Sequence, residues 1–205
     1  MGNVINLSKA RQNTEVKAAD LMDMGEYAHV RKQKRAELVP HKTARRVAIG
    51  PHATFYFESY KTMWFQIHEM LFIEKGGAAQ IPDELNAYNP LIPKGRDLSA
   101  TLMFEIDDEN LRRKVLEKLG GVEETIFIKF GDEEIVARAE TDVDRTTADG
   151  KASSVQFIHF DFTDEQAAIF KAFDGDIMLG IQHEQYPHMT LLSDDTKATL
   201  RADLA

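Results

Sequence analysis

The second half of the chain repeats one arrangement of elements twice, and this repetition limits the folds available to it. Each copy reads as a strand, a helix that ends at a glycine, and a second strand. The first copy covers residues 98–130 and the second residues 153–182, with a predicted hairpin turn at 130–133 between them. This order predicts an α+β fold with a mixed or antiparallel sheet and helices on one face. Ferredoxin-like strand–helix–strand units are one arrangement that fits the second half.

The first half is predicted to be mainly helical. Residues 24–38 predict a basic helix that ends before Pro40. Residues 45–57 then predict one or two strands. A further helix is expected from Tyr60 to about Lys75, and its apolar residues lie nearly all round, as in a helix that is buried on most sides.

The polarity of the sequence sets the expected domain limits. Residues 1–18 are polar and without periodicity, so we expect a flexible tail there. The remaining residues, 19–205, are expected to form a single α+β domain. Within it, residues 19–97 form a helical half and residues 98–205 form the strand–helix–strand units.

The sequence of 205 residues contains no cysteine. This excludes disulfides, thiolate catalysis, cysteine-ligated iron–sulfur clusters and zinc sites that use cysteine. Polar residues interrupt every apolar stretch, and the first residues lack the apolar core of a secretory signal. We therefore expect a cytoplasmic protein without membrane association.

Charge is distributed unevenly along the chain. Residues 28–46 contain seven Lys and Arg residues against a single Glu, a local balance of +6; with −9 overall, the rest of the chain carries −15. The basic segment at 31–46 could bind an anion or a nucleic acid. A general nucleic-acid-binding protein of this size is usually basic overall, so packing against the chain's own acidic surface is favoured.

Two polar residues fall within the apolar helix. Gln66 and Glu69 are three positions apart and share a face. A buried carboxylate must be paired, protonated or bound to a metal, because burial of an isolated charge costs several kcal/mol. Glu69 is therefore either a metal ligand or general base, or the partner of Arg45 or Arg46. The ion pair is favoured.

Three histidines form a second group of candidates. His159 lies in a predicted strand, His183 ends another, and His188 follows in a loop. If the two strands are neighbours, the three imidazoles could hold iron, zinc or manganese, together with the carboxylate of Glu105 or Asp161. The alternative is that each histidine is a structural residue with its own hydrogen-bond partners.

The long polar loop at residues 141–154 contains Arg145 and Lys151 on either side of a glycine. Its backbone N–H groups could bind an anion. The spacing differs from that of a phosphate-binding loop, so a mobile, solvated loop is favoured.

Four strings together resemble the bacterial family known as domain of unknown function 3501: RRVAIGPHATFYFES, FQIHEMLFIEKGG, IPDELNAYNPLIPKGRDLSATLMFEID and DVDRTTADGKASSVQFIHF. The resemblance extends from about Ala18 to the C-terminus. The residues that match the family pattern are Arg45, Arg46, Gly50, Pro51, Glu58, Gln66, Glu69, Glu74, Asn89, Pro90, Glu105, Arg145, Lys151, His183 and His188.

The resemblance implies a context rather than an activity. Members of this family tend to be encoded beside rubrerythrin-like di-iron proteins and an iron–sulfur oxidoreductase. This implies a role in peroxide detoxification or redox metabolism through contact with such proteins. The candidate polar pocket consists of Arg45, Arg46, Glu58, Gln66, Glu69, Glu105, Arg145 and Lys151.

Three functional hypotheses follow. The first is an accessory or binding protein of a redox system, with rubrerythrin-like and iron–sulfur proteins as partners. The second is a metal-dependent enzyme that uses His159, His183 and His188 with a glutamate. The third is anion or nucleic-acid binding through residues 31–46. The sequence leaves open whether the protein is an enzyme.

Overall fold

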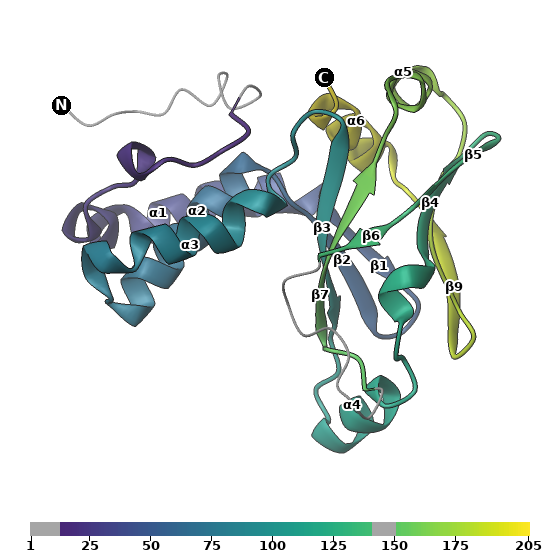
Figure 1. Ribbon diagram of the computed structural model, residues 1–205, viewed down its shortest axis with the longest axis horizontal. Coiled ribbons are helices and arrows are strands. Elements are labelled where there is room, and N and C mark those ends of the chain that lie inside the picture. The colour runs from purple at the N-terminus through teal and green to yellow at the C-terminus, as the bar shows by residue number, and fades with distance from the viewer. Residues whose placement is uncertain (1–12, 141–150) are drawn as a thin grey trace.

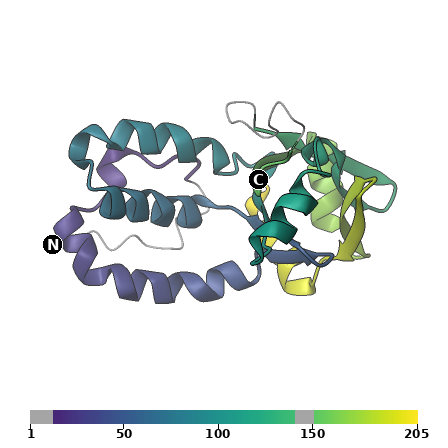
Figure 2. The ribbon, with the colours of Figure 1, turned by 90° about the horizontal axis from the view of Figure 1, so that it is seen from below.

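The computed structural model describes residues 13–140 and 151–205. Within these ranges the protein contains six α-helices and two antiparallel sheets, which confirms the expected α+β class (Figure 1). The two sheets and three of the helices form one part, which we call the body. The other three helices project from it, and we call this part, with residues 13–23, the arm (Figures 1 and 2).

Both sheets belong to the body, and every strand pair in them is antiparallel. Sheet A has the strand order β1 (Arg46–Ile49), β2 (Ala53–Phe57), β3 (Asp97–Phe104), β7 (Val155–Asp161) and β6 (Arg138–Ala139). Sheet B has the order β5 (Glu133–Val136), β4 (Ile126–Phe130), β8 (Ile177–His183) and β9 (Tyr186–Leu191).

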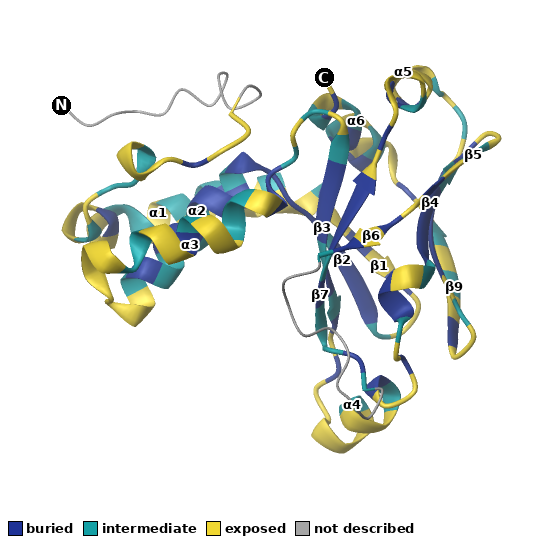
Figure 3. Ribbon diagram, in the orientation of Figure 1, coloured by how far each residue is buried: buried dark blue, intermediate teal, exposed yellow. Residues whose placement is uncertain are grey.

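The apolar faces of the two sheets enclose the main core. Side chains alternate along each strand, so every second residue points inward. Sheet A contributes Phe55, Leu102 and Phe160, and sheet B contributes Phe130 and Leu179, all of them buried. Figure 3 shows the buried strands of the body facing one another across this core.

Tyr186 on β9 joins the two sheets at one side. Its hydroxyl accepts hydrogen bonds from the backbone N–H groups of His52 and Ala53, at 2.9 and 3.0 Å, and donates to the carbonyl of Ile49 at 2.8 Å. These three bonds tie β9 to the turn between β1 and β2.

The second half does not form ferredoxin-like units in a single sheet. In each strand–helix–strand unit the first strand lies in sheet A and the second in sheet B, so α4 (Glu109–Leu116) and α5 (Asp164–Ala172) connect the two sheets. The helices also do not share one face, because α5 and α6 (Asp194–Asp203) lie at one end of the body and α4 at the other (Figure 1). The order of elements was predictable, whereas strand pairing depends on contacts far apart in sequence.

The arm consists of α1 (Met24–Thr43), α2 (Tyr60–Glu74) and α3 (Ile81–Tyr88), with α2 in the middle (Figure 2). It has a core of its own. Trp64, Ile67 and Leu71 on α2 pack with Leu91 and Ile92, which follow α3. This small core holds the three helices together independently of the body core.

α1 does not end before Pro40 as predicted but continues to Thr43. A proline inside a helix removes one backbone hydrogen bond, and neighbouring contacts can hold the turn in place. Here Leu38 is buried, and Lys61 Nζ on α2 donates to the carbonyl of Glu37 at 3.1 Å. These tertiary contacts stabilise the last turn.

Residues 13–18 fall in the predicted tail but lie against the helices of the arm. Val16 is fully buried, its N–H donates to Asn89 Oδ1 at 2.7 Å, and its carbonyl accepts from Asn89 Nδ2 at 3.0 Å. Trp64 Nε1 donates to the carbonyl of Asp20 at 2.9 Å. Residues 1–12, the rest of the predicted tail, lie outside the described residues.

Over the ranges that the structure describes, no helix has both the length and the apolar content needed to cross a membrane.

Candidate functional site

Glu69 on α2 is held by α1. Its carboxylate accepts hydrogen bonds from Arg31 Nε and Nη2, both at 2.8 Å, and from the hydroxyl of Tyr27 at 2.7 Å. The Arg31 guanidinium lowers the pKa of Glu69, and burial together with this carboxylate raises the pKa of Tyr27. The predicted ion pair therefore exists, but Arg45 or Arg46 as its partner was wrong. The pair joins two helices of the arm rather than a helix and a strand.

A groove of about 400 Å³ runs between α1 and α2, and we call it the arm groove. Its lining residues are Arg35, Leu38, Val39 and Lys42 of α1 and Phe65, Gln66, Glu69, Met70 and Ile73 of α2. Val39 and Ile73 are 61% and 60% exposed, so two large apolar side chains face solvent at this groove. Gln66 and Glu69 therefore do share a face, and that face borders a groove.

Ion pairs neutralise most of the basic segment. Four of its seven cations are paired, Arg31 with Glu69, Lys34 with Glu37, Arg45 with Asp203 and Arg46 with Glu105. In the described part of the chain, Lys32, Arg35 and Lys42 have no ion-pair partner. Two of these three, Arg35 and Lys42, line the arm groove.

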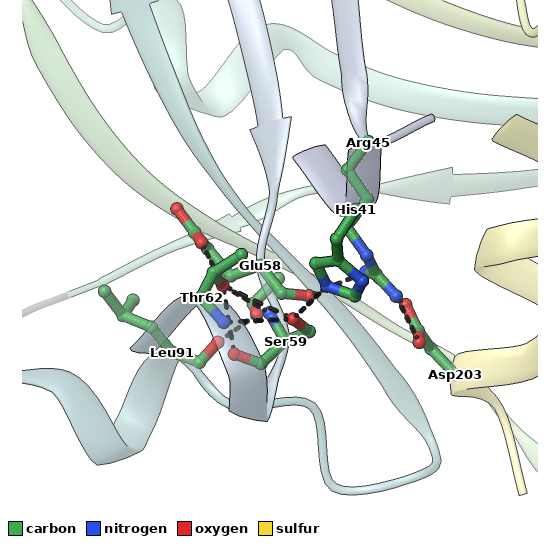
Figure 4. A network of polar contacts seen from close by, with 8 residues as sticks. His41, Arg45, Glu58, Ser59, Thr62, Leu91 and Asp203 are labelled. Atoms are coloured by element: carbon green, nitrogen blue, oxygen red, sulfur yellow. Dashed lines mark hydrogen bonds and ion pairs between the residues drawn. The ribbon is translucent and has the colours of Figure 1, made fainter. Parts of the chain in front are cut away.

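A second polar cluster lies where the arm meets the body (Figure 4). Arg45 donates from Nη1 and Nη2 to the two carboxylate oxygens of Asp203 on α6, both at 2.7 Å, and from Nη1 to the carbonyl of Glu58 at 3.0 Å. Arg45 is only 5% exposed, and its Nε has no hydrogen-bond partner among the described residues. Arg45 thus fixes α6 to the base of the arm.

The buried carboxylate of Glu58 connects three elements of this cluster. It accepts hydrogen bonds from Thr62 Oγ1 on α2 at 2.6 Å and from Thr101 Oγ1 on β3 at 2.7 Å. Burial raises the pKa of Glu58, and the two hydroxyl donors act in the opposite direction. Glu58 is therefore a structural residue, closed in by its partners.

His41 and Ser59 form the part of the cluster that borders open space. His41 Nε2 lies 2.9 Å from Ser59 Oγ, which also accepts a hydrogen bond from the N–H of Thr62 and so caps α2. Burial, together with the cations of Arg45 and Lys61, lowers the pKa of His41 to about 4. The imidazole is therefore neutral at pH 7.

Arg46 and Glu105 lie elsewhere, on the face of sheet A that points away from the body core. Arg46 Nη2 is 3.4 Å from Glu105 Oε2, and the hydroxyl of Tyr56 donates to Glu105 Oε1 at 2.8 Å. The Arg46 guanidinium also lies 5.5 Å from the centre of the Tyr56 ring. Both charged side chains are exposed. The residues of the predicted polar pocket are therefore divided among the arm groove, the polar cluster where the arm meets the body, and this face of sheet A.

The three candidate metal-binding histidines are separated. His159, on β7 in sheet A, has its Nε2 at 3.1 Å from Glu140 Oε2 and its Nδ1 at 3.9 Å from Asp97 Oδ2. His183 and His188 belong to β8 and β9 of sheet B. Within residues 13–140 and 151–205, no three His, Cys, Asp or Glu residues are grouped closely enough to hold a metal ion.

The other candidates can be placed only in part. His183 Nε2 lies 3.3 Å from the carbonyl of Gly120, and the ring of His188 packs against Tyr186 with 4.3 Å between ring centres. Lys151 is half-buried, and Arg145 lies outside the described residues.

Sequence reasoning did not single out His41 or Ser59. Ser59 and Thr62 have the spacing of a helix cap, which marks the start of α2 and could have drawn attention to Ser59. No comparable signal existed for His41, because the helix was expected to end before it.

Comparison with known proteins gives the family. The family described as "Protein of unknown function (DUF3501)" matches residues 15–204. The chain belongs to this family. The resemblance seen in the sequence is thereby confirmed, with almost the same limits.

A solved structure is similar over nearly the whole chain. It is the crystal structure of a novel protein of unknown function from Burkholderia pseudomallei K96243, with 37% sequence identity and a TM-score of 0.85. The match covers 93% of this chain and 99% of that one. A search of the curated proteins finds no match.

Proposed function

We propose that this member of the family is an accessory protein of a bacterial redox or peroxide-stress system. In this proposal the arm groove docks an acidic surface of a partner protein. The observation that carries the proposal is the arm itself, which projects from the body (Figure 1). In the described structure its groove is lined by exposed apolar residues beside two cations that form no ion pair.

The composition of the arm groove suits a protein partner. Interfaces between proteins combine an apolar centre with a polar rim, and complementary charge guides the encounter. In the arm groove Val39 and Ile73 supply exposed apolar surface, and Arg35 and Lys42 supply positive charge beside it. The complementary surface would be a helix with apolar residues on one side and Asp or Glu beside them.

The redox context comes from the family. Rubrerythrin-like and iron–sulfur proteins are the partners that the resemblance implies, and the chain fits such an arrangement because it contains no cysteine. A thiolate-ligated cluster would therefore belong to the partner. The task of this protein would be to bind the partner and position it.

The other two hypotheses have less support. The three histidines do not meet in the described structure, so the metal-dependent enzyme lacks its predicted ligand set. Four of the seven cations at 31–46 are already paired with carboxylates, which weakens the case for a nucleic-acid surface.

Calorimetric titration tests the proposal. The purified protein is titrated with the rubrerythrin-like protein and with the iron–sulfur oxidoreductase of the same organism, at low and at moderate salt. Val39→Glu should weaken binding at least about tenfold, because it places a negative charge where an acidic partner docks. Added salt should weaken binding by the wild-type protein.

The matched control is Val136→Glu. Val136 is 59% exposed and lies on β5, on the side of the body away from the arm (Figure 1). The Val136→Glu variant should bind the partner protein with the affinity of the wild type. Absence of binding to both proteins, or equal loss in the two variants, would contradict the proposal.

A further inference from the structure

A larger groove lies beside the His41–Ser59 pair, where the arm meets the body. We call it the junction groove. Its volume is about 770 Å³, within the range of small-molecule sites. Five parts of the chain line it: residues 13–14, the end of α1 at Pro40, the start of α2 at Ser59, the connector Ile92–Gly95, and the end of α6 at Ala202.

Two lysines in the junction groove have hydrogen-bonding capacity left. Lys61 Nζ donates to the carbonyl of Glu37 at 3.1 Å, and Lys94 Nζ donates to the carbonyls of Asn89, at 2.9 Å, and Thr14. An ammonium group has three N–H donors, so each lysine retains at least one. Across the described residues, neither lysine forms an ion pair. Glu37 lies near Lys61, and Asp97 and Glu15 lie near Lys94, but none is in ion-pair contact, so both ammonium groups keep a donor for a ligand.

Further donors lie close to these lysines. The first N–H groups of any α-helix have no acceptor within the helix, and Tyr60 and Lys61, which open α2, line the groove. Arg45 also lines the groove, and its buried Nε has no partner among the described residues. Because the Nε atom is enclosed, Arg45 is a neighbour of the groove rather than one of its free donors.

Part of the wall is polar, with Asn13, Thr14, Thr199 and Asp203, and the Asp203 carboxylate is paired with Arg45. Another part is apolar. Pro40, Ala44, Ile92, Ala198 and Leu204 line the groove together with the ring of Tyr60. We propose that the junction groove binds a small organic anion, with its carboxylate or phosphate group at Lys61 and Lys94 and its apolar part against this wall.

The His41–Ser59 pair resembles the nucleophile and base of a hydrolase, but its surroundings favour binding. A general base must become positively charged during the reaction. Arg45 and Lys61 oppose a positive charge on His41, and in the described structure no carboxylate is hydrogen-bonded to its ring. Neutral His41 instead orders the Ser59 hydroxyl at the edge of the groove.

The test uses nuclear magnetic resonance titrations of the full-length, isotope-labelled protein with three probes. Hexanoate and hexyl phosphate share an apolar chain and differ in the anionic group, and hexan-1-ol has the chain without the charge. At least one anion should produce saturable shifts of the backbone amides of Ser59, Lys61 and Gly95. The anion whose shifts saturate shows whether the site prefers a carboxylate or a phosphate, and hexan-1-ol should produce no comparable shifts.

Two variants locate the site. Lys61→Met and Lys94→Met keep an unbranched side chain that is one atom shorter and remove its charge. Each should weaken binding at least about tenfold, as loss of a charge-assisted hydrogen bond does. Lys114→Met is the control, because Lys114 lies on α4 at the opposite end of the body from α6 (Figure 1). No saturable shifts with either anion, equal binding of hexan-1-ol, or unchanged affinity in both variants would overturn the inference.

This inference is independent of the arm groove. A negative result in the anion titrations would not contradict partner docking in the arm groove. A negative result with the partner proteins would not contradict the anion site.

Discussion

Protonation of His68 should loosen the arm. The side chain is fully buried on α2, Nε2 accepts a hydrogen bond from the N–H of Met22 at 3.0 Å, and Nδ1 lies 2.7 Å from the carbonyl of Trp64. Because Nε2 must accept and Nδ1 must donate, the ring is neutral, with its proton on Nδ1. Burial lowers the pKa of His68 from 6.5 to about 4.

The size of the effect follows from these two pKa values. Between pH 6.5 and 4 the unfolded chain binds a proton at this position and the folded chain does not. Stability is therefore fully present above pH 6.5 and is lost as the pH falls toward 4. The loss attributable to His68 is roughly 2 kcal/mol at pH 5 and roughly 3 kcal/mol below pH 4.

Urea unfolding at pH 7.5 and pH 5 measures this loss. Trp64, the single tryptophan, reports on the arm, because its ring centre lies 3.8 Å from that of His68. The comparison variant is His68→Gln, whose amide can accept from one neighbour and donate to the other without titrating. Between the two pH values the wild type should lose about 2 kcal/mol more than the variant.

Other groups that titrate in this range, such as His41, are present in both proteins and cancel in the difference. An equal loss of unfolding free energy in the wild type and in His68→Gln would refute the reasoning.

Two changes test the contact between β9 and the first hairpin. Tyr186→Phe should lower the free energy of unfolding by about 1–3 kcal/mol, because it leaves the N–H groups of His52 and Ala53 without their acceptor. Urea unfolding checks this, and a loss below about 0.5 kcal/mol would show that water replaces the hydroxyl. Gly50→Ala should also destabilise by about 1–2 kcal/mol, because Gly50 has a φ of +61° and an added Cβ would lie 2.6 Å from the ring of His188. A thermal melt with an unchanged midpoint would contradict it.

Local signals in the sequence were sufficient to predict most elements. Thr163 and Gln166 have the spacing of a capping box, which marks the start of α5 in the sequence, and both reciprocal hydrogen bonds are present at 3.1 Å. Strand pairing was not predictable in the same way. The apolar alternation of β3 is compatible with a place in either sheet, and its pairing with β7, a strand far along the chain, places it in sheet A. The predicted end of α1 before Pro40 was wrong, because tertiary contacts outweigh the preference of one proline for ending a helix.

For the candidate sites too, local features were predictable and long-range partners were not. That Glu69 needs a partner follows from one residue and its burial, but the identity of Arg31 depends on how α1 packs on α2. The Arg45–Asp203 pair joins residues 158 positions apart, and no local pattern connects them. The junction groove arises from the same long-range contacts, so the sequence alone could not have indicated it.

We propose that a redox partner docks in the arm groove. Hydrogen–deuterium exchange of this protein, alone and mixed with the rubrerythrin-like and iron–sulfur proteins of its organism, tests that claim most directly. Docking in the arm groove should slow exchange at residues 35–43 of α1 and 65–74 of α2 and leave the strands of the body unchanged. Slower exchange confined to the body, or no change with either partner, would contradict it.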